Sequence, residues 1–73
     1  MNRAGNEIEV DCYAGYRADE TPRRFSVGPR LVAIVSIIDR GVTPDYRYFK
    51  VRGDDGSVYR LVQSLDTRKW KLE

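Results

Sequence analysis

Apolar and polar residues alternate along several short stretches of the chain, which is the pattern of β-strands that bury one face. Residues 7–12 alternate strictly, Phe25 and Val27 lie in a second short stretch, and Trp70 and Leu72 lie in a last one. Turn-forming residues separate these stretches at hairpin spacing, and none has the helical period. The chain is therefore predicted to be all-β, a six-strand antiparallel meander that forms a small barrel or a strongly bent sheet.

The stretch from residue 30 to residue 39 differs because its apolar residues follow one another without alternating. It is rich in Ile and Val, which predicts a strand buried on much of both faces. Residues 41–45, Gly-Val-Thr-Pro-Asp, are predicted to end it. Residues 14–22 are predicted to form a loop, or at most one helical turn before Pro22. Residues 1–6 are predicted to be a disordered N-terminus, which leaves residues 7–73 as a single β-domain.

The hairpin within residues 46–64 can be predicted down to its register. The three-residue loop Asp54-Asp55-Gly56 suits a type I turn followed by a glycine in the left-handed region. That loop length places Val51 opposite Tyr59, so that the apolar residues of both strands share the inner face. The predicted core gathers the large apolar residues of the inward phase: Phe25, Val35, Ile37, Phe49, Val51, Tyr59, Leu61 and Trp70.

Composition places the chain among folded domains with a thin core. Its 73 residues are 41% hydrophobic and 33% charged, and its net charge is +2. The charge is uneven, because residues 1–20 hold five acidic and two basic residues whereas residues 21–53 hold seven basic and two acidic ones. Either the basic middle pairs with the chain's own acidic first strand, or it faces phosphate or an acidic protein.

Enzyme chemistry of the familiar kinds lacks its usual residues here. The chain has no histidine, which removes the common general base, the usual nucleophile pairs and the commonest metal ligand. Its one cysteine, Cys12, lies on the apolar phase of its strand and is predicted to fill the core. Asp39 and Asp45 flank a polar loop, where solvated acids are a simpler interpretation than a catalytic pair. The sequence therefore predicts no enzyme, no cofactor and no metal site.

Targeting features point to the cytoplasm. The longest apolar run, residues 31–38, is far shorter than the ~20 residues that span a bilayer. The chain opens without the pattern of a secretory signal, and a single cysteine is unlike the several disulfides of small secreted domains.

The outward face of the predicted hairpin mixes aromatic and basic residues, which is how small β-folds stack bases and hold phosphates. The candidate binding surface consists of Tyr46, Tyr48, Lys50, Arg52 and Arg60. In the predicted register Lys50 lies opposite Arg60, a like-charge pair that an anionic partner would relieve. The alternative is that the two tyrosines cover a second core layer or a dimer seam while the cations are solvated.

Several segments resemble known proteins, namely residues 16–25, 38–40, 44–51, 55–56 and the closing Trp70. Together they resemble a family of small bacterial domains of unknown function, over about residues 13–72. Residues 38–72 also resemble the C-terminal appendage of some accessory translesion-polymerase proteins. In the first pattern a bulky aromatic follows Asp-Arg, whereas this chain has Gly41. Neither resemblance implies an activity or a catalytic residue.

Two functional hypotheses remain, and neither involves catalysis. The first is a protein-interaction module whose partner is another protein or a second copy of the chain, as a homodimer. The second is a module that binds single-stranded nucleic acid through the outward hairpin face. A membrane partner is not expected, because no segment suits one.

Overall fold

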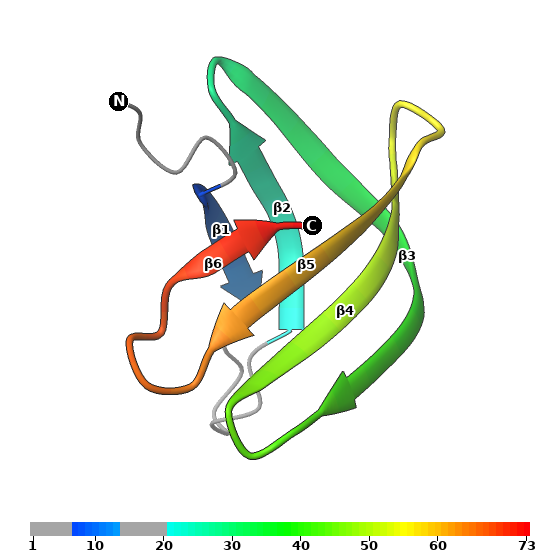
Figure 1. Ribbon diagram of the computed structural model, residues 1–73. Helices are drawn as coiled ribbons and strands as arrows, with labels where there is room; N and C mark the ends of the chain where they lie inside the picture. Colours follow the sequence, from blue (N-terminus) through cyan, green and yellow to red (C-terminus); the bar gives the residue numbers. More distant parts are fainter. Residues whose placement is uncertain (1–6, 14–20) are drawn as a thin grey trace.

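A computed structural model describes residues 7–13 and 21–73, and within them six antiparallel strands close into a small barrel (Figure 1). The strands are β1 (Glu7–Tyr13), β2 (Thr21–Val27), β3 (Arg30–Val42), β4 (Tyr46–Gly53), β5 (Val58–Ser64) and β6 (Trp70–Leu72). Each strand pairs with the next along the chain, and β6 returns to pair with β1. The predicted all-β barrel is confirmed. The predictions for residues 1–6 and 14–20 lie outside the described residues, and Thr21 and Pro22 belong to β2 rather than to a loop.

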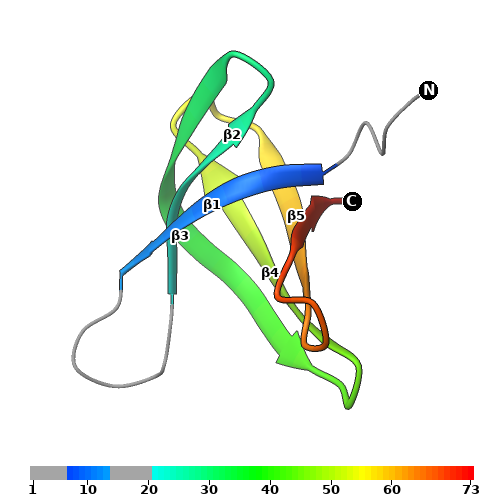
Figure 2. The same ribbon diagram turned by 90° about the vertical axis from the view of Figure 1, so that its left-hand side faces the viewer.

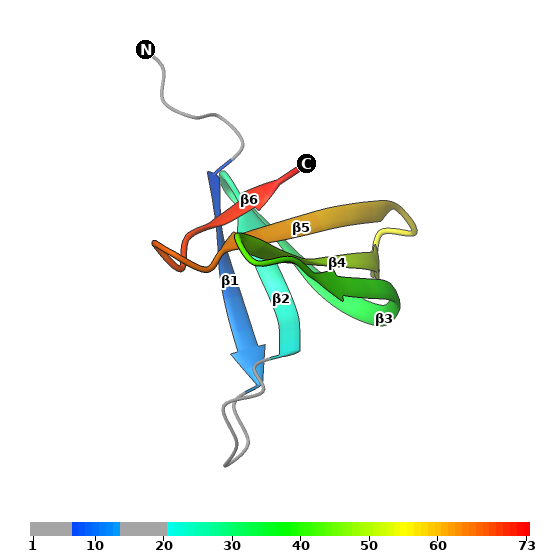
Figure 3. The ribbon, with the colours of Figure 1, turned by 60° about the horizontal axis from the view of Figure 1, so that its bottom comes forward.

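The long strand β3 belongs to both halves of the barrel. Its first residues, 30–33, pair with β2, whereas residues 34–42 pair with β4. Two β-bulges, between Ile34 and Ser36 and between Ile37 and Asp39, interrupt the second pairing. Because each bulge bends its strand and increases the local twist, β3 can run from the β2 hairpin to the far end of β4, as Figure 2 shows. In Figure 3, β3, β4 and β5 extend together away from β1.

The core lies inside the barrel and takes residues from every strand. Its buried apolar members are Ile8, Phe25, Val32, Phe49, Val51, Leu61 and Trp70. Five of the eight predicted core residues are among these seven, and two more, Ile37 and Tyr59, are partly buried against them. The phenyl ring of Phe25 meets Tyr59 edge-on, with the ring centroids 5.0 Å apart.

The prediction for Val35 was wrong, and so was the prediction that β3 is buried on both faces. Val35 is 64% exposed, and Leu31, Ile38 and Val42 on the same strand are exposed as well. A barrel of one layer has a single interior, so only one face of each strand can be buried. The bulges moreover shift the phase of β3 between Ile34 and Ile37, which simple alternation cannot reveal.

The β4–β5 hairpin has the predicted register, with Val51 opposite Tyr59. The amide of Gly56 donates to the carbonyl of Gly53 at 3.0 Å, and Gly56 has a φ of 86°, which a glycine adopts without strain. Gly53 has a different requirement. A Cβ on Gly53 would come within 2.6 Å of the Val32 side chain, so the position where the turn begins has no room for a side chain.

Candidate functional site

The predicted hairpin surface lies on the outside of β4 and β5, but its members differ in how freely they meet solvent. Lys50 and Arg52 are exposed, whereas Tyr46, Tyr48 and Arg60 are partly buried. The register between β4 and β5 places all five on one outer face, as predicted. The partial burial of Tyr46, Tyr48 and Arg60 was not predicted from the sequence.

Tyr48 is held between two neighbours. It pairs with Gly41 across β3 and β4, and its ring occupies the space that a side chain at position 41 would need, since a Cβ there would lie 2.5 Å from Tyr48 Cε2. The guanidinium carbon of Arg60 lies 4.3 Å from the centroid of the same ring, a cation–π contact. One face of Tyr48 is therefore already occupied, which limits its use as a platform for a stacked base.

The charges on this face are largely balanced from within. Lys50 does lie opposite Arg60, as predicted, but Asp39 faces Lys50 from β3 on its other side. Arg60 Nε lies 2.7 Å from Glu73 Oε1 at the end of the chain. The Glu73 carboxylate thus offsets part of the repulsion between the two cations from within the chain.

The basic and aromatic character continues beyond the hairpin onto β6. Lys71 lies beside Val62 in the sheet, and Lys69 precedes β6 in the β5–β6 turn. Together with Tyr46 they line a hollow of about 470 Å³. Sequence reasoning missed Lys69 and Lys71, although the predicted strand around Trp70 and Leu72 already placed Lys71 on the outward phase.

A polar contact lies inside the core, where Arg47 on β4 is opposite Gln63 on β5. Gln63 is 3% exposed, and its Oε1 accepts a hydrogen bond of 2.7 Å from Arg47 Nε. The Arg47 guanidinium carbon also lies 5.4 Å from the centroid of the Phe49 ring and 5.7 Å from that of Trp70. A buried amide and a guanidinium over two aromatic rings satisfy each other, so this cluster is structural.

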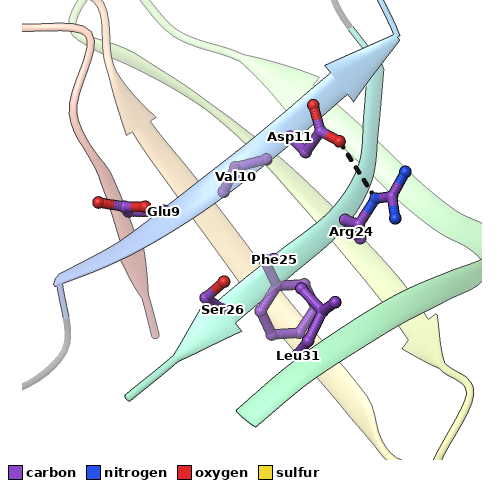
Figure 4. A pocket seen from close by; sticks show the side chains of 7 residues that line it. All are labelled: Glu9, Val10, Asp11, Arg24, Phe25, Ser26 and Leu31. Atoms are coloured by element: carbon purple, nitrogen blue, oxygen red, sulfur yellow. Dashed lines mark ion pairs between the residues drawn. The ribbon is translucent and has the colours of Figure 1, made fainter. Parts of the chain in front are cut away.

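A pocket of about 310 Å³ lies outside β1, β2 and the start of β3 (Figure 4). At one side of it Arg24 Nε forms an ion pair of 3.1 Å with Asp11 Oδ2. The pair joins the basic middle of the chain to its acidic first strand. This is the pairing that one of the two explanations of the uneven charge predicts. Both side chains are about half exposed, so the pair contributes little to stability.

The Asp55 carboxylate has a structural role in the β4–β5 turn. It accepts hydrogen bonds from the Tyr59 hydroxyl, from the Ser57 amide at 3.0 Å and from Arg30 at 2.8 Å. These donors, the Tyr59 hydroxyl first, lower the pKa of Asp55 below its ordinary value. Arg30 begins β3, so this carboxylate ties the start of β3 to the turn after β4.

Residues 7–13 and 21–73 show no cluster of side chains that could hold a metal ion. No three His, Cys, Asp or Glu side chains come together there as a metal site. Cys12 is partly buried and packs against the core, as predicted. Asp39 and Asp45 are both exposed. No helix in this part of the chain is long and apolar enough to span a membrane.

Comparison with known proteins adds no name to this site. No family model, no curated protein and no solved structure matches the chain. The two resemblances described above stay predictions.

Proposed function

We propose that this chain is a non-enzymatic protein-interaction module, and that it docks through the outer face of β3 onto a second copy of itself. The observation that carries the proposal is the exposure of large aliphatic side chains on this one strand. Leu31 is 62% exposed, Val35 64% and Ile38 46%, and these three form what we call the β3 apolar face. Where exposed aliphatic side chains form one patch on a small soluble domain, the patch commonly marks an interaction site.

The docking surface is the face of β3 rather than its backbone edge. Residues 34–42 pair with β4 on one side, and no described strand pairs with them on the other. An open edge can accept a partner strand, but bulges are a common way to block such pairing. The two bulges at Ile34/Ser36 and Ile37/Asp39 favour contact through side chains instead.

A second copy suits this face because the face can match itself. In a two-fold dimer the same patch is used by both subunits. Leu31 precedes Val35 by four residues and Ile38 follows it by three. An antiparallel two-fold arrangement centred on Val35 therefore places Leu31 of one copy near Ile38 of the other, with aliphatic groups on both sides of the contact.

Sedimentation equilibrium over a concentration series tests the proposal. We expect wild-type protein to dimerise and Val35→Lys to remain a folded monomer, because a charge in the centre of the contact is not paired. The matched control is Val58→Lys, which changes another exposed valine on the outside of β5 and should dimerise like wild type. A wild-type chain that stays monomeric at every concentration would exclude the second copy, and equal effects of both substitutions would exclude the β3 apolar face.

A further inference from the structure

The hollow on the outside of β5 and β6 combines three kinds of lining group. Tyr46 and Val62 provide aromatic and aliphatic surface, Ser64 and Thr67 lie beside them, and Lys69 and Lys71 supply positive charge. We call it the β5–β6 hollow. It lies away from the β3 apolar face, and its volume of about 470 Å³ is within the range of small-ligand sites.

Tyr46 is held in place by the turn that precedes β4. The Thr43 hydroxyl accepts hydrogen bonds from the amides of Asp45 and Tyr46, at 3.2 and 3.1 Å, and donates to the Tyr46 carbonyl at 3.0 Å. Tyr46 then begins the ladder to β5 opposite Ser64. The ring is therefore carried by a fixed backbone, and no cation–π contact to it is found among the described residues, in contrast to Tyr48.

The two lysines are positioned by the β5–β6 turn and by the sheet. The Ser64 amide donates to the Lys69 carbonyl at 2.9 Å, and the Thr67 hydroxyl accepts from the Lys69 amide at 3.3 Å. Lys71 lies between Val62 on β5 and Glu7 on β1. Both lysine side chains thus start from backbone that is held by hydrogen bonds in the turn or in the sheet.

The charges of the hollow decide which anion it can hold. Lys69 Nζ is 3.9 Å from Glu7 Oε2, and the Lys69 side chain is 70% exposed, so this ion pair is weak and exchangeable. Glu7 and Asp45 also line the hollow and oppose an anion. A free phosphate therefore gains little, whereas a phosphate joined to a flat aromatic group also gains contact with Tyr46.

We propose that the β5–β6 hollow binds a nucleotide unit of single-stranded nucleic acid, with the base against Tyr46 and the phosphate at Lys69 and Lys71. The strand then continues along the outside of β4, where Lys50 and Arg52 are exposed. Sequence-independent binding of this kind combines base stacking on aromatic rings with cations along the backbone. Tyr46, rather than Tyr48, is the stacking residue, because Arg60 already covers Tyr48.

Fluorescence anisotropy with a labelled oligothymidine, repeated over a salt series, tests the assignment. Tyr46→Leu should weaken binding about 5- to 150-fold with little change in the salt slope, and Tyr46→Phe should bind like wild type. Lys69→Gln and Lys71→Gln should each reduce the slope of log affinity against log salt by about 0.7. Arg68→Gln removes the same charge from the same turn but does not line the hollow, so it should change the slope less.

A wild-type protein that shows no binding at low salt overturns the proposal, as does an Arg68→Gln effect as large as that of Lys71→Gln. Amide spectra with thymidine monophosphate and with inorganic phosphate separate the sources of the ligand. Shifts at Val62 and Lys71 with the nucleotide, and much weaker ones with phosphate, support the base contact. Equal shifts with both overturn it, and a monophosphate that binds as tightly as the oligonucleotide overturns the assignment to a strand.

Discussion

β3 and β4 lie side by side in the barrel, yet they divide their residues in different ways. On β4, Phe49 and Val51 are buried while Lys50 and Arg52 between and beyond them are exposed. On β3 the apolar residues outnumber the places that the interior offers, and Val35 is among those left outside. Regular alternation fixes which face of a strand is buried. A continuous apolar run predicts a strand but does not show which of its faces is buried.

The two strands also differ in where their apolar side chains lie. Phe49 packs on Trp70 with ring centroids 6.0 Å apart, which joins β4 to β6 across the interior. Leu31 and Ile38 make no comparable contribution to the core and remain on the surface. The apolar side chains of β4 therefore stabilise the barrel, whereas several of those of β3 lie exposed on its surface.

The largest expected loss of stability comes from a substitution on β4. Phe49→Ala should lower the free energy of unfolding by about 3–5 kcal/mol, because it removes a 3% exposed ring from a thin core. Urea denaturation followed by tryptophan fluorescence measures the loss, since Trp70 adjoins the ring. An unchanged unfolding midpoint would contradict the position of Phe49 in the core.

One substitution made on both strands sharpens the comparison. Val51 is fully buried, so Val51→Ala should cost about 1.5–3 kcal/mol, whereas Val35→Ala should change the free energy of unfolding by less than about 0.5 kcal/mol. Both variants are unfolded in urea at a concentration where the chain is monomeric. Similar losses in the two variants would mean that Val35 is buried after all.

The smallest expected effect concerns the carboxylate that links the two strands. The pKa of Asp55 is lowered in the folded chain, chiefly by the Tyr59 hydroxyl, with the Ser57 amide and Arg30 contributing. Its stabilising contribution is therefore present above the unfolded pKa of about 3.9 and is lost as the pH falls through the lower, folded pKa.

Unfolding midpoints measured from neutral to acid pH should fall for the wild type below about pH 4, and Asp55→Asn should flatten that fall. Asp54→Asn, at the neighbouring turn residue, is the control and should keep the pH dependence of the wild type. A curve for Asp55→Asn that matches the wild type at every pH would show that this carboxylate does not join Arg30 to the turn.

Local patterns were enough to predict most of this fold. The loop Asp54-Asp55-Gly56 has one favourable conformation, and that conformation determined the register between Val51 and Tyr59. Bulges have no comparable signal, because an extra residue in a run of Ile and Val leaves the composition of the run unchanged. The exposure of Val35 follows from the bulges and from the closure of the barrel, so it needed the structure.

The candidate surfaces were less accessible to sequence reasoning because they depend on distant segments. Tyr48 and Arg60 were placed on the same face, but their direct contact and the ion pair of Arg60 with Glu73 both depend on side-chain conformation. Lys69 and Tyr46 line the same hollow because of the β5–β6 turn. In this turn Arg68 has a φ of 67°, an uncommon value for a residue other than glycine.

The Tyr48 ring lies over Gly41 and fills the space that a side chain at position 41 would need. A ring projecting from position 41 of β3 and a ring projecting from position 48 of β4 compete for the same space, since any Cβ at 41 meets Tyr48 at 2.5 Å. An aromatic residue at position 41 and the glycine found here would thus be alternative ways to cover the same patch of sheet. Residues 41 and 48 are expected to vary together, the ring being supplied by one strand or by the other.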